Sequence, residues 1–292
     1  MEKEKIIEAG KIASEIKQWI KPQIKKGTPL LEIAEKIENK IEELGAFPAF
    51  PVNLSINEQA AHYTPTHNDE SLAHGLLKVD FGVQVEGYIA DTAFSLDLEN
   101  SEENKKLIEA SRQALDNVEE NISAEILLGD VGKIIEDTIN SFGYNPVTNL
   151  SGHLMERFTL HAGVSVPNID NKSDFELGEG LYAIEPFATN GGGKIHDGTK
   201  GNIYLWSEDK NIRSPLAREI LEYIKDNFGS LPFASRWLVK EFGSKALLAL
   251  RQLENEEIVH HYAILTEEKG TLVSQAENTF LIEEDKVIIT TK

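Results

Sequence analysis

The chain has 292 residues and carries 29 basic against 49 acidic side chains, a formal net charge of −20. Such an acidic surface repels nucleic acid and anionic membranes, so we expect neither as a partner. The sequence contains no cysteine, which excludes disulfides, thiol catalysis and thiolate metal sites and leaves histidine, aspartate and glutamate as metal ligands. The charged N-terminus lacks the apolar segment of a signal peptide, and no apolar run could span a bilayer, so we predict a cytoplasmic protein.

The first hundred residues begin with two predicted helices. Apolar residues recur at helical spacing over residues 3–26 and again from Leu30 to Leu44, with Gly27-Thr28-Pro29 as the break between them. The same pattern returns about a hundred residues later, where Ser101 precedes one predicted helix and Gly129-Asp130 opens another.

The two helical regions match each other position by position. The sets that correspond at an offset of 98 are Ile37, Ile41, Leu44, Gly45 and Pro48 with Ile135, Ile139, Phe142, Gly143 and Pro146. Asn53-Leu54-Ser55 also matches Asn149-Leu150-Ser151, at an offset of 96. Chance similarity between amphipathic helices is the alternative, but the shared Asn-Leu-Ser lies outside the helices. We therefore favour an internal duplication.

Each predicted pair of helices is followed by strand patterns. The predicted strands are Leu77–Val83, Ile89–Leu96, Phe158–Val166 and Leu181–Phe187, with a closing hairpin from Leu272–Ile282 and Val287–Thr290. Residues 189–265 break this order with further helical patterns, one of them capped by Ser214-Pro215. These elements predict an α+β fold in which helices cover one face of an antiparallel sheet.

Two aspartates in the first predicted hairpin suggest a charged site. With a turn centred on Val85-Glu86, Asp80 and Asp91 would face each other with Cβ atoms about 4.5–5.5 Å apart. Two facing carboxylates need a shared proton or a cation to be tolerated. The alternative is an exposed sheet edge with two solvated acids, and a register error of one residue would separate the pair.

Three further residues fit the cation hypothesis. Glu185 lies inside an apolar strand and Glu277 leads into another, where carboxylates are rarely left unpaired. His153 taken alone is better explained as a structural histidine, but it follows the duplicated motif directly. One imidazole and four carboxylates suit two divalent ions of the harder kind. Two such ions about 3.5–4 Å apart can activate water for amide hydrolysis.

These segments resemble the methionine aminopeptidase family, most closely type 2, the archaeal and eukaryotic form. The resemblance extends over nearly the whole chain and rests on seven motifs in the family's order. They are Ala60-Ala61-His62-Tyr63-Thr64-Pro65, Val79-Asp80-Phe81-Gly82, Asp91-Thr92-Ala93, Ser151-Gly152-His153, His161-Ala162-Gly163, Ile184-Glu185-Pro186-Phe187 and Gln275-Ala276-Glu277.

The resemblance implies a fold and an activity. The fold would be the pita-bread fold of two related halves. Residues 1–188 and 266–292 would together form the catalytic domain, with residues 189–265 as an inserted helical subdomain. The activity would be removal of the initiator methionine from nascent proteins and peptides with a small second residue. The cofactors would be two divalent metal ions, Co, Mn, Fe or Zn, and we expect a monomer.

The resemblance also implies roles for the ligand residues. Asp80 would bind one metal, Asp91 and Glu277 would bridge both, and His153 and Glu185 would complete the second. Glu185 would in addition act as a general base towards the attacking water.

Further residues are implied for the substrate. His62 and His161 would be catalytic, contacting the scissile amide and its carbonyl, where a neutral donor stabilises the oxyanion. The full implied substrate-binding set is Phe50, His62, Leu160, His161, His196 and Leu272. Asn278 is a departure, because family members often carry histidine after the last glutamate. The residue at this position is not a ligand in the family pattern, so we expect Asn278 to adjust the activity and not to abolish it.

Two other functions remain open at this stage. Prolidase and aminopeptidase P, which are proline-directed peptidases, resemble the same fold and use the same ligand types, although the long segment between Glu185 and Glu277 argues against them. A non-catalytic protein-binding scaffold of the same fold is a second alternative, which the presence of all five ligand types disfavours.

Overall fold

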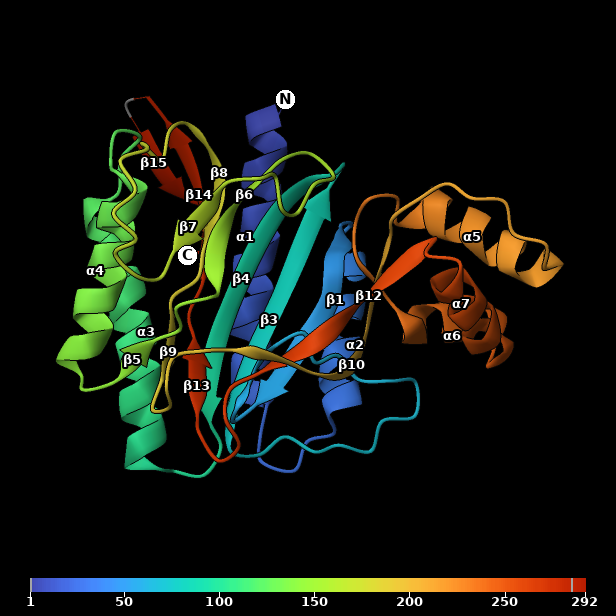
Figure 1. The fold of residues 1–292 in the computed structure, drawn as a ribbon, viewed down its shortest axis with the longest axis horizontal. Coiled ribbons are helices and arrows are strands. Elements are labelled where there is room, and N and C mark those ends of the chain that lie inside the picture. Colours follow the sequence, from blue (N-terminus) through green and yellow to red (C-terminus); the bar gives the residue numbers. More distant parts are fainter. Residues whose placement is uncertain (1, 285) are drawn as a thin grey trace.

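The computed structural model describes residues 2–284 and 286–292 (Figure 1). Its helices are α1 (Glu2–Ile20), the short 3-10 helix η1 (Lys21–Gln23), α2 (Leu30–Glu43), α3 (Glu102–Asn121), α4 (Leu128–Ser141), α5 (Pro215–Asn227), α6 (Ser235–Phe242) and α7 (Lys245–Asn255). None of these helices is long and apolar enough to cross a membrane.

The strands of the described residues form four sheets. The first contains β1 (Phe47–Ile56), β3 (Leu76–Val85) and β4 (Tyr88–Asp97), in the order β1-β3-β4. The second has the order β15-β14-β8-β6-β7, from β15 (Lys286–Ile289), β14 (Asn278–Glu283), β8 (Gly180–Ile184), β6 (Ser151–Met155) and β7 (Ser165–Pro167). The third joins β13 (Val273–Gln275), β9 (Phe187–Thr189) and β5 (Asn145–Pro146), and the fourth joins β11 (Phe233–Ala234), β10 (His196–Trp206), β12 (Val259–Thr266) and β2 (Gln59–Ala61).

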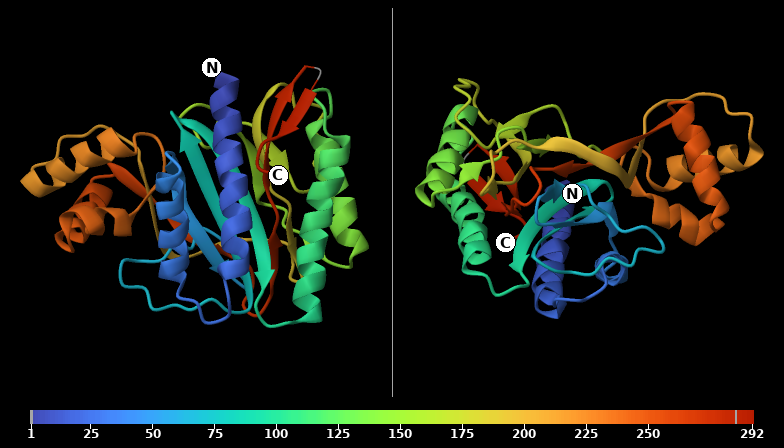
Figure 2. Two further views of the ribbon diagram at one scale, coloured as in Figure 1. Left: turned by 180° about the vertical axis from the view of Figure 1, so that it is seen from behind. Right: turned by 60° about the horizontal axis from the view of Figure 1, so that its bottom comes forward.

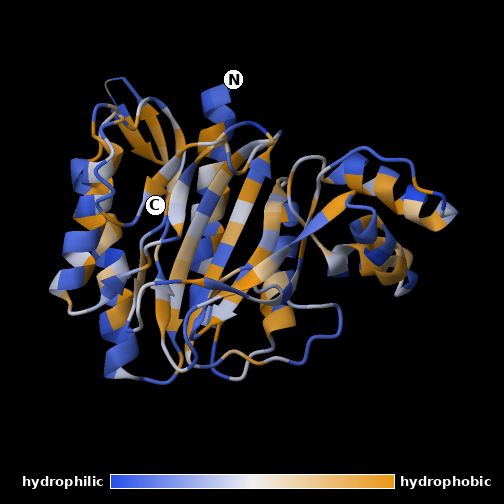
Figure 3. Cartoon of the chain, in the orientation of Figure 1, coloured by the Kyte–Doolittle hydropathy of each residue, from blue (hydrophilic) through white to orange (hydrophobic). Residues whose placement is uncertain are grey.

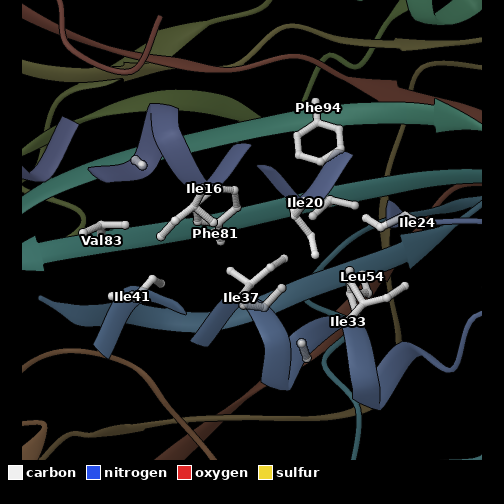
Figure 4. Packing of buried hydrophobic residues seen from close by; sticks show 14 of the residues in the cluster. Ile16, Ile20, Ile24, Ile33, Ile37, Ile41, Leu54, Phe81, Val83 and Phe94 are labelled. Carbon is white, nitrogen blue, oxygen red and sulfur yellow. The ribbon is translucent and has the colours of Figure 1, made fainter. Parts of the chain in front are cut away.

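Helices cover one face of the first sheet. Phe81 and Val83 on β3 pack in one buried cluster with Ile16 and Ile20 of α1 and Ile37 of α2 (Figure 4). Successive strand residues point to opposite faces. The packing of Phe81 and Val83 on the helices therefore turns Asp80, between Val79 and Phe81, to the other face of the sheet. In the hydropathy view, hydrophobic residues dominate these central strands, whereas α4 shows many hydrophilic ones (Figure 3).

The elements of the two halves repeat. Both α2 and α4 have 14 residues, and they begin and end 98 positions apart. Each is followed by a glycine with a φ of 81°, Gly45 and Gly143, the left-handed geometry that commonly ends a helix. The helix pair α3 and α4 covers the second sheet as α1 and α2 cover the first (Figure 2). This repetition agrees with the duplication inferred from the sequence.

One predicted strand is wrong. Residues 158–166 were expected to form a strand, but only Ser165–Pro167 does. Phe158 and Gly163 have positive φ values of 57° and 92°, which interrupt an extended chain. The backbone N–H of Phe158 instead donates to the carbonyl of Gly87 at 2.8 Å, which fastens this loop to the tip of the β3–β4 hairpin.

The segment predicted as a helical insertion contains α5, α6 and α7 around a buried cluster of their own. It also contains the long strands β10 and β12, which pair with each other. Strand β12 then pairs with β2, through Leu265 and Ala61, so the segment continues into the rest of the molecule (Figure 1). The domain boundaries at residues 189 and 265 stay a prediction.

Candidate metal centre and active site

The β3–β4 hairpin places Asp80 and Asp91 on one face but not opposite each other. Asp80 pairs with Ala93, and Asp91 pairs with Gly82. The turn lies at Glu86-Gly87, whose φ values of 53° and 88° are typical of a two-residue hairpin turn. The turn centre is thus one residue later than predicted, which moves the pairing by two positions. Because a shift of two preserves the face, the aspartates become diagonal neighbours.

Three buried side chains converge beside this hairpin. Ligand atoms of Asp91, His153 and Glu277 all lie within 4.8 Å of one another, and Nε2 of His153 is 3.7 Å from Oδ2 of Asp91. The exposed fractions of the three residues are 3%, 8% and 2%. Strand β6 supplies His153, while Glu277 lies between β13 and β14 and forms an isolated bridge with Ala93. The site therefore joins the two halves of the chain.

Gln275 links the remaining two carboxylates. Its Nε2 donates to Oε2 of Glu185 at 3.1 Å and to Oδ2 of Asp80 at 3.4 Å. Glu185 comes directly after the end of β8, and Gln275 is the last residue of β13. The sequence motif contained Gln275 but gave it no role, because the contact depends on pairing between distant strands.

The electrostatics of the cluster favour a bound cation. Burial raises the pKa of Asp80 to about 7. Burial, followed by repulsion from the neighbouring carboxylates, holds the pKa values of Asp91 and Glu277 well above the ordinary range. The pKa of Glu185 is raised for the same two reasons, with Asp80 as the repelling neighbour. Four carboxylates in one buried place would each be easier to ionise beside positive charge.

The residues present fit a metal. Among the described side chains, buried oxygens without a hydrogen-bond partner include Asp80 Oδ1, Asp91 Oδ1 and Glu277 Oε2. Leaving a buried acceptor unpaired is unfavourable, and three such acceptors in one carboxylate cluster match the oxygen ligands that hard divalent ions prefer. One imidazole in the set suits ions of the Mn, Fe, Co or Zn type as well.

His62 is held in a defined orientation at the rim. Its Nδ1 lies 3.2 Å from the carbonyl oxygen of Ala263. A carbonyl only accepts, so we assign the ring hydrogen to Nδ1. Burial lowers the pKa of His62 to about 4, which leaves the ring neutral with Nε2 as an acceptor. The Nε2 atom of His62 can therefore accept a hydrogen bond from an N–H group of the substrate. In this tautomer Nε2 carries no hydrogen, so it cannot donate to the oxyanion.

His161 lies next to the ligand histidine. Its ring centroid is 4.4 Å from that of His153, in an edge-on arrangement with an interplanar angle of 65°. Partial burial lowers the pKa of His161, so the ring is neutral at pH 7. Its side chain is exposed to the cavity, on the loop that was wrongly predicted as a strand.

A cavity of about 380 Å³ opens over these groups. Of the residues predicted to bind substrate, Phe50, His62, Leu160 and His161 line it. The other two lie elsewhere: His196 starts β10 with an exposed side chain, and Leu272 packs against the core of the second half. The apolar residues that line the cavity without having been predicted include Phe187, Ile203, Pro232, Tyr262 and Leu265. All five lie in or next to the strands β9 to β12. Phe187 ends the Ile184–Phe187 motif, but no sequence pattern connected the other four to the site.

Residues 4–213 match the sequence model of metallopeptidase family M24. The chain belongs to this family, among the methionine aminopeptidases. Its M24 relatives include the methionine aminopeptidase of Methanocaldococcus jannaschii, 48% identical over 99% of this chain and 98% of the relative. That of Pyrococcus abyssi is 46% identical over the full length of both chains. These matches confirm the resemblance seen in the sequence motifs.

Solved structures confirm the pita-bread fold of this M24 chain. A methionine aminopeptidase from Thermotoga maritima has a TM-score of 0.71 at 21% identity, covering 99% of this chain and 96% of that one. A thermophilic Arx1 has a TM-score of 0.84 at 15% identity, with 98% and 89% covered. The prolidase from Pyrococcus furiosus reaches 0.61 at 16% identity, and only 64% of its chain is covered.

Proposed function

We propose that this M24 metallopeptidase removes the N-terminal methionine from peptides and newly made proteins whose second residue is small. The observation that carries the proposal is the convergence of Asp91, His153 and Glu277 under the cavity, in a chain 48% identical to a methionine aminopeptidase over its full length. We place the activity in the cytoplasm, where new N-termini arise, and propose a monomer.

We propose two divalent metal ions as the cofactors of the enzyme. Asp80 would hold one, Asp91 and Glu277 would lie between both, and His153 and Glu185 would complete the second. When bound, the ions supply Lewis acidity that activates water and polarises the scissile carbonyl. The unpaired buried oxygens of Asp80, Asp91 and Glu277 support this ligand set.

The protein's own groups would perform the proton transfers. Gln275 holds Oε2 of Glu185, which leaves Oε1 to take the proton of the attacking water and pass it to the leaving amine. Nε2 of His62, an acceptor in the assigned tautomer, would accept a hydrogen bond from the N–H of the scissile amide. His161, neutral and exposed to the cavity, would donate to the carbonyl oxygen as its negative charge develops.

The cavity walls support selection of an unbranched apolar side chain. Phe50, Leu160, Ile203, Pro232 and Leu265 surround the space next to the carboxylates. Mostly apolar walls with a few convergent polar groups are typical of small-ligand sites. We propose this lining as the methionine pocket, in place of the predicted set that included His196 and Leu272.

A panel of short peptides tests the assignment. We expect cleavage of Met-Ala-Ser by the metal-loaded protein, much slower cleavage of Leu-Ala-Ser, and no release of the first residue from Ala-Pro peptides. Equal cleavage of the methionine and leucine peptides would refute the methionine assignment, and a preference for Ala-Pro would establish the proline-directed alternative. Binding of metal without cleavage of any peptide would favour the scaffold alternative.

A further inference from the structure

We propose that Lys17 is a positioning residue of the metal centre, whose ammonium group fixes and electrostatically balances the two carboxylates assigned to lie between the ions. Lys17 is on α1, behind the first sheet and outside the cavity (Figure 2). The inference rests on the proposed metal site but not on the choice of methionine as substrate.

The Lys17 side chain reaches the residues that follow both carboxylates in the sequence. Its Nζ donates to Oγ1 of Thr92 at 3.0 Å and to Oδ1 of Asn278 at 2.9 Å. Thr92 follows Asp91, and Asn278 follows Glu277. One ammonium group thus contacts the side chain that directly follows each of the two ligands.

The same contacts tie the two ligand segments to each other. Oγ1 of Thr92, which accepts from Lys17, donates to the carbonyl of Glu277 at 2.9 Å. Ala93 and Glu277 also exchange backbone hydrogen bonds, with N–O distances of 3.4 and 3.1 Å. A rotation of either segment would have to break the contact with Lys17, so the network limits how far the carboxylates can separate.

Asn278 is suited to this network. Its Oδ1 accepts from both Lys17 and Oγ1 of Thr291, and its Nδ2 donates to Oε1 of Glu119. Oδ1 faces two donors and Nδ2 faces a carboxylate, so the orientation of the amide is defined. At a position where family members often carry histidine, Asn278 thus supplies an acceptor to Lys17 and a donor to Glu119.

The charge of Lys17 adds to the geometric effect. Burial lowers the pKa of Lys17 to about 8, and attraction to Glu277 opposes that shift. The ammonium form therefore still predominates at pH 7. It supplies positive charge close to Glu277 without occupying a ligand position, as outer groups around metal sites commonly do.

Metal titration of the full-length chain after removal of bound metal tests the proposal. We expect Lys17→Met to weaken Mn²⁺ binding by about 10-fold, the lower end of the range for groups behind metal ligands, whereas Lys17→Arg restores most of the affinity. Lys11→Met is the matched control, because Lys11 is an exposed lysine on the same helix. It should bind Mn²⁺ like the parent.

Two further variants keep the test decisive if Lys17→Met does not fold. Asn278→Leu and Thr92→Val each remove one acceptor of Lys17 and should also weaken Mn²⁺ binding. In the double variant Lys17→Met/Asn278→Leu the losses should be less than additive. The role of Lys17 is overturned if folded Lys17→Met binds Mn²⁺ with the parent's affinity. It is also overturned if both Asn278→Leu and Thr92→Val do so. A parent chain that binds no Mn²⁺ would instead overturn the proposed metal centre itself.

Discussion

Nε2 of His153 lies 3.7 Å from Oδ2 of Asp91, although the two residues belong to different halves of a duplicated chain. Asp91 is on β4 of the first half and His153 on β6 of the second. Each half alone lacks part of the proposed ligand set. The proposed metal centre therefore requires that both halves are packed together.

Replacing the histidine tests this relationship. His153→Ala should reduce kcat/KM on Met-Ala-Ser by more than about 100-fold, because it removes the imidazole ligand of the set. Steady-state kinetics at fixed metal concentration measures the effect. His74→Ala is the control, since His74 is exposed and outside the cavity. Equal activity of the two variants would show that His153 is only structural.

The buried ring of His62 makes the fold sensitive to acid. Its pKa is about 4 in the folded protein and near 6.5 in an unfolded chain. The unfolded chain therefore takes up a proton between these values, and stability present above pH 6.5 is lost as the pH falls towards 4. From pH 7 to pH 5 this contributes a loss of roughly 1 to 2 kcal/mol.

Urea unfolding of the metal-free parent and of His62→Asn measures this contribution. Asparagine suits the positive φ of 67° at this position. We expect the parent to lose more stability than the variant between pH 7 and pH 5. Parallel pH profiles would mean that His62 is protonated in the folded state at pH 5.

A buried ion pair fastens α6 to α2. The guanidinium of Arg236 contacts the Glu38 carboxylate and donates to Oγ1 of Thr64 at 2.6 Å and to the carbonyl of Pro65 at 3.0 Å. Arg236→Met leaves the Glu38 charge buried and should destabilise the protein by about 3–5 kcal/mol in urea unfolding.

An exposed ion pair on α2 provides the comparison for Arg236. Lys36 and Glu32 are both about half exposed, so Lys36→Met should change the unfolding free energy by less than about 1 kcal/mol. If the two variants lose similar stability, the pair of Arg236 and Glu38 does not anchor α6 to α2.

The pocket wall depends on a missing side chain at Gly82. A Cβ atom there would collide with the ring of Phe50 and lie 2.9 Å from Cβ of Ala49. Gly82→Ala should therefore displace Phe50 and reduce kcat/KM on Met-Ala-Ser by about 10-fold, a typical effect of reshaping an apolar pocket. In Gly192→Ala the new Cβ meets no atom within 4 Å, so this control should keep full activity. Equal kinetics of the two variants would remove Phe50 from the pocket.

Much of this site could be predicted from sequence because its residues stand in local patterns. Strand alternation predicted that Asp80 and Asp91 lie on one face of the sheet. That prediction stayed correct although the turn was misplaced by one residue, because the error shifted the strand pairing by two positions. The positive φ of Phe158 could not be read from a residue type that favours strands, and the loop carrying His161 was predicted as a strand, although Gly163 is a residue type that strands disfavour.

Other parts of the site depend on contacts between distant segments. Lys17 and Asn278 lie 261 positions apart, and Gln275 and Asp80 lie 195 apart. No periodicity connects such pairs, since they meet only when α1 lies against β14 and β13 lies against β3. His196 and Leu272 lie outside the cavity lining. Walls that the sequence did not indicate come from β10, β12 and the loop before β11.

Metal titration of the full-length chain tests the central claim most directly. After complete removal of metal, the parent should take up two Mn²⁺ ions per chain, and Asp91→Asn should take up fewer and bind them more weakly. The ligand atom of Asp91 lies within 4.8 Å of those of His153 and Glu277. Because Asp91 is proposed to contact both ions, its loss should affect both. Equal stoichiometry and affinity in the parent and in Asp91→Asn would contradict the dinuclear centre.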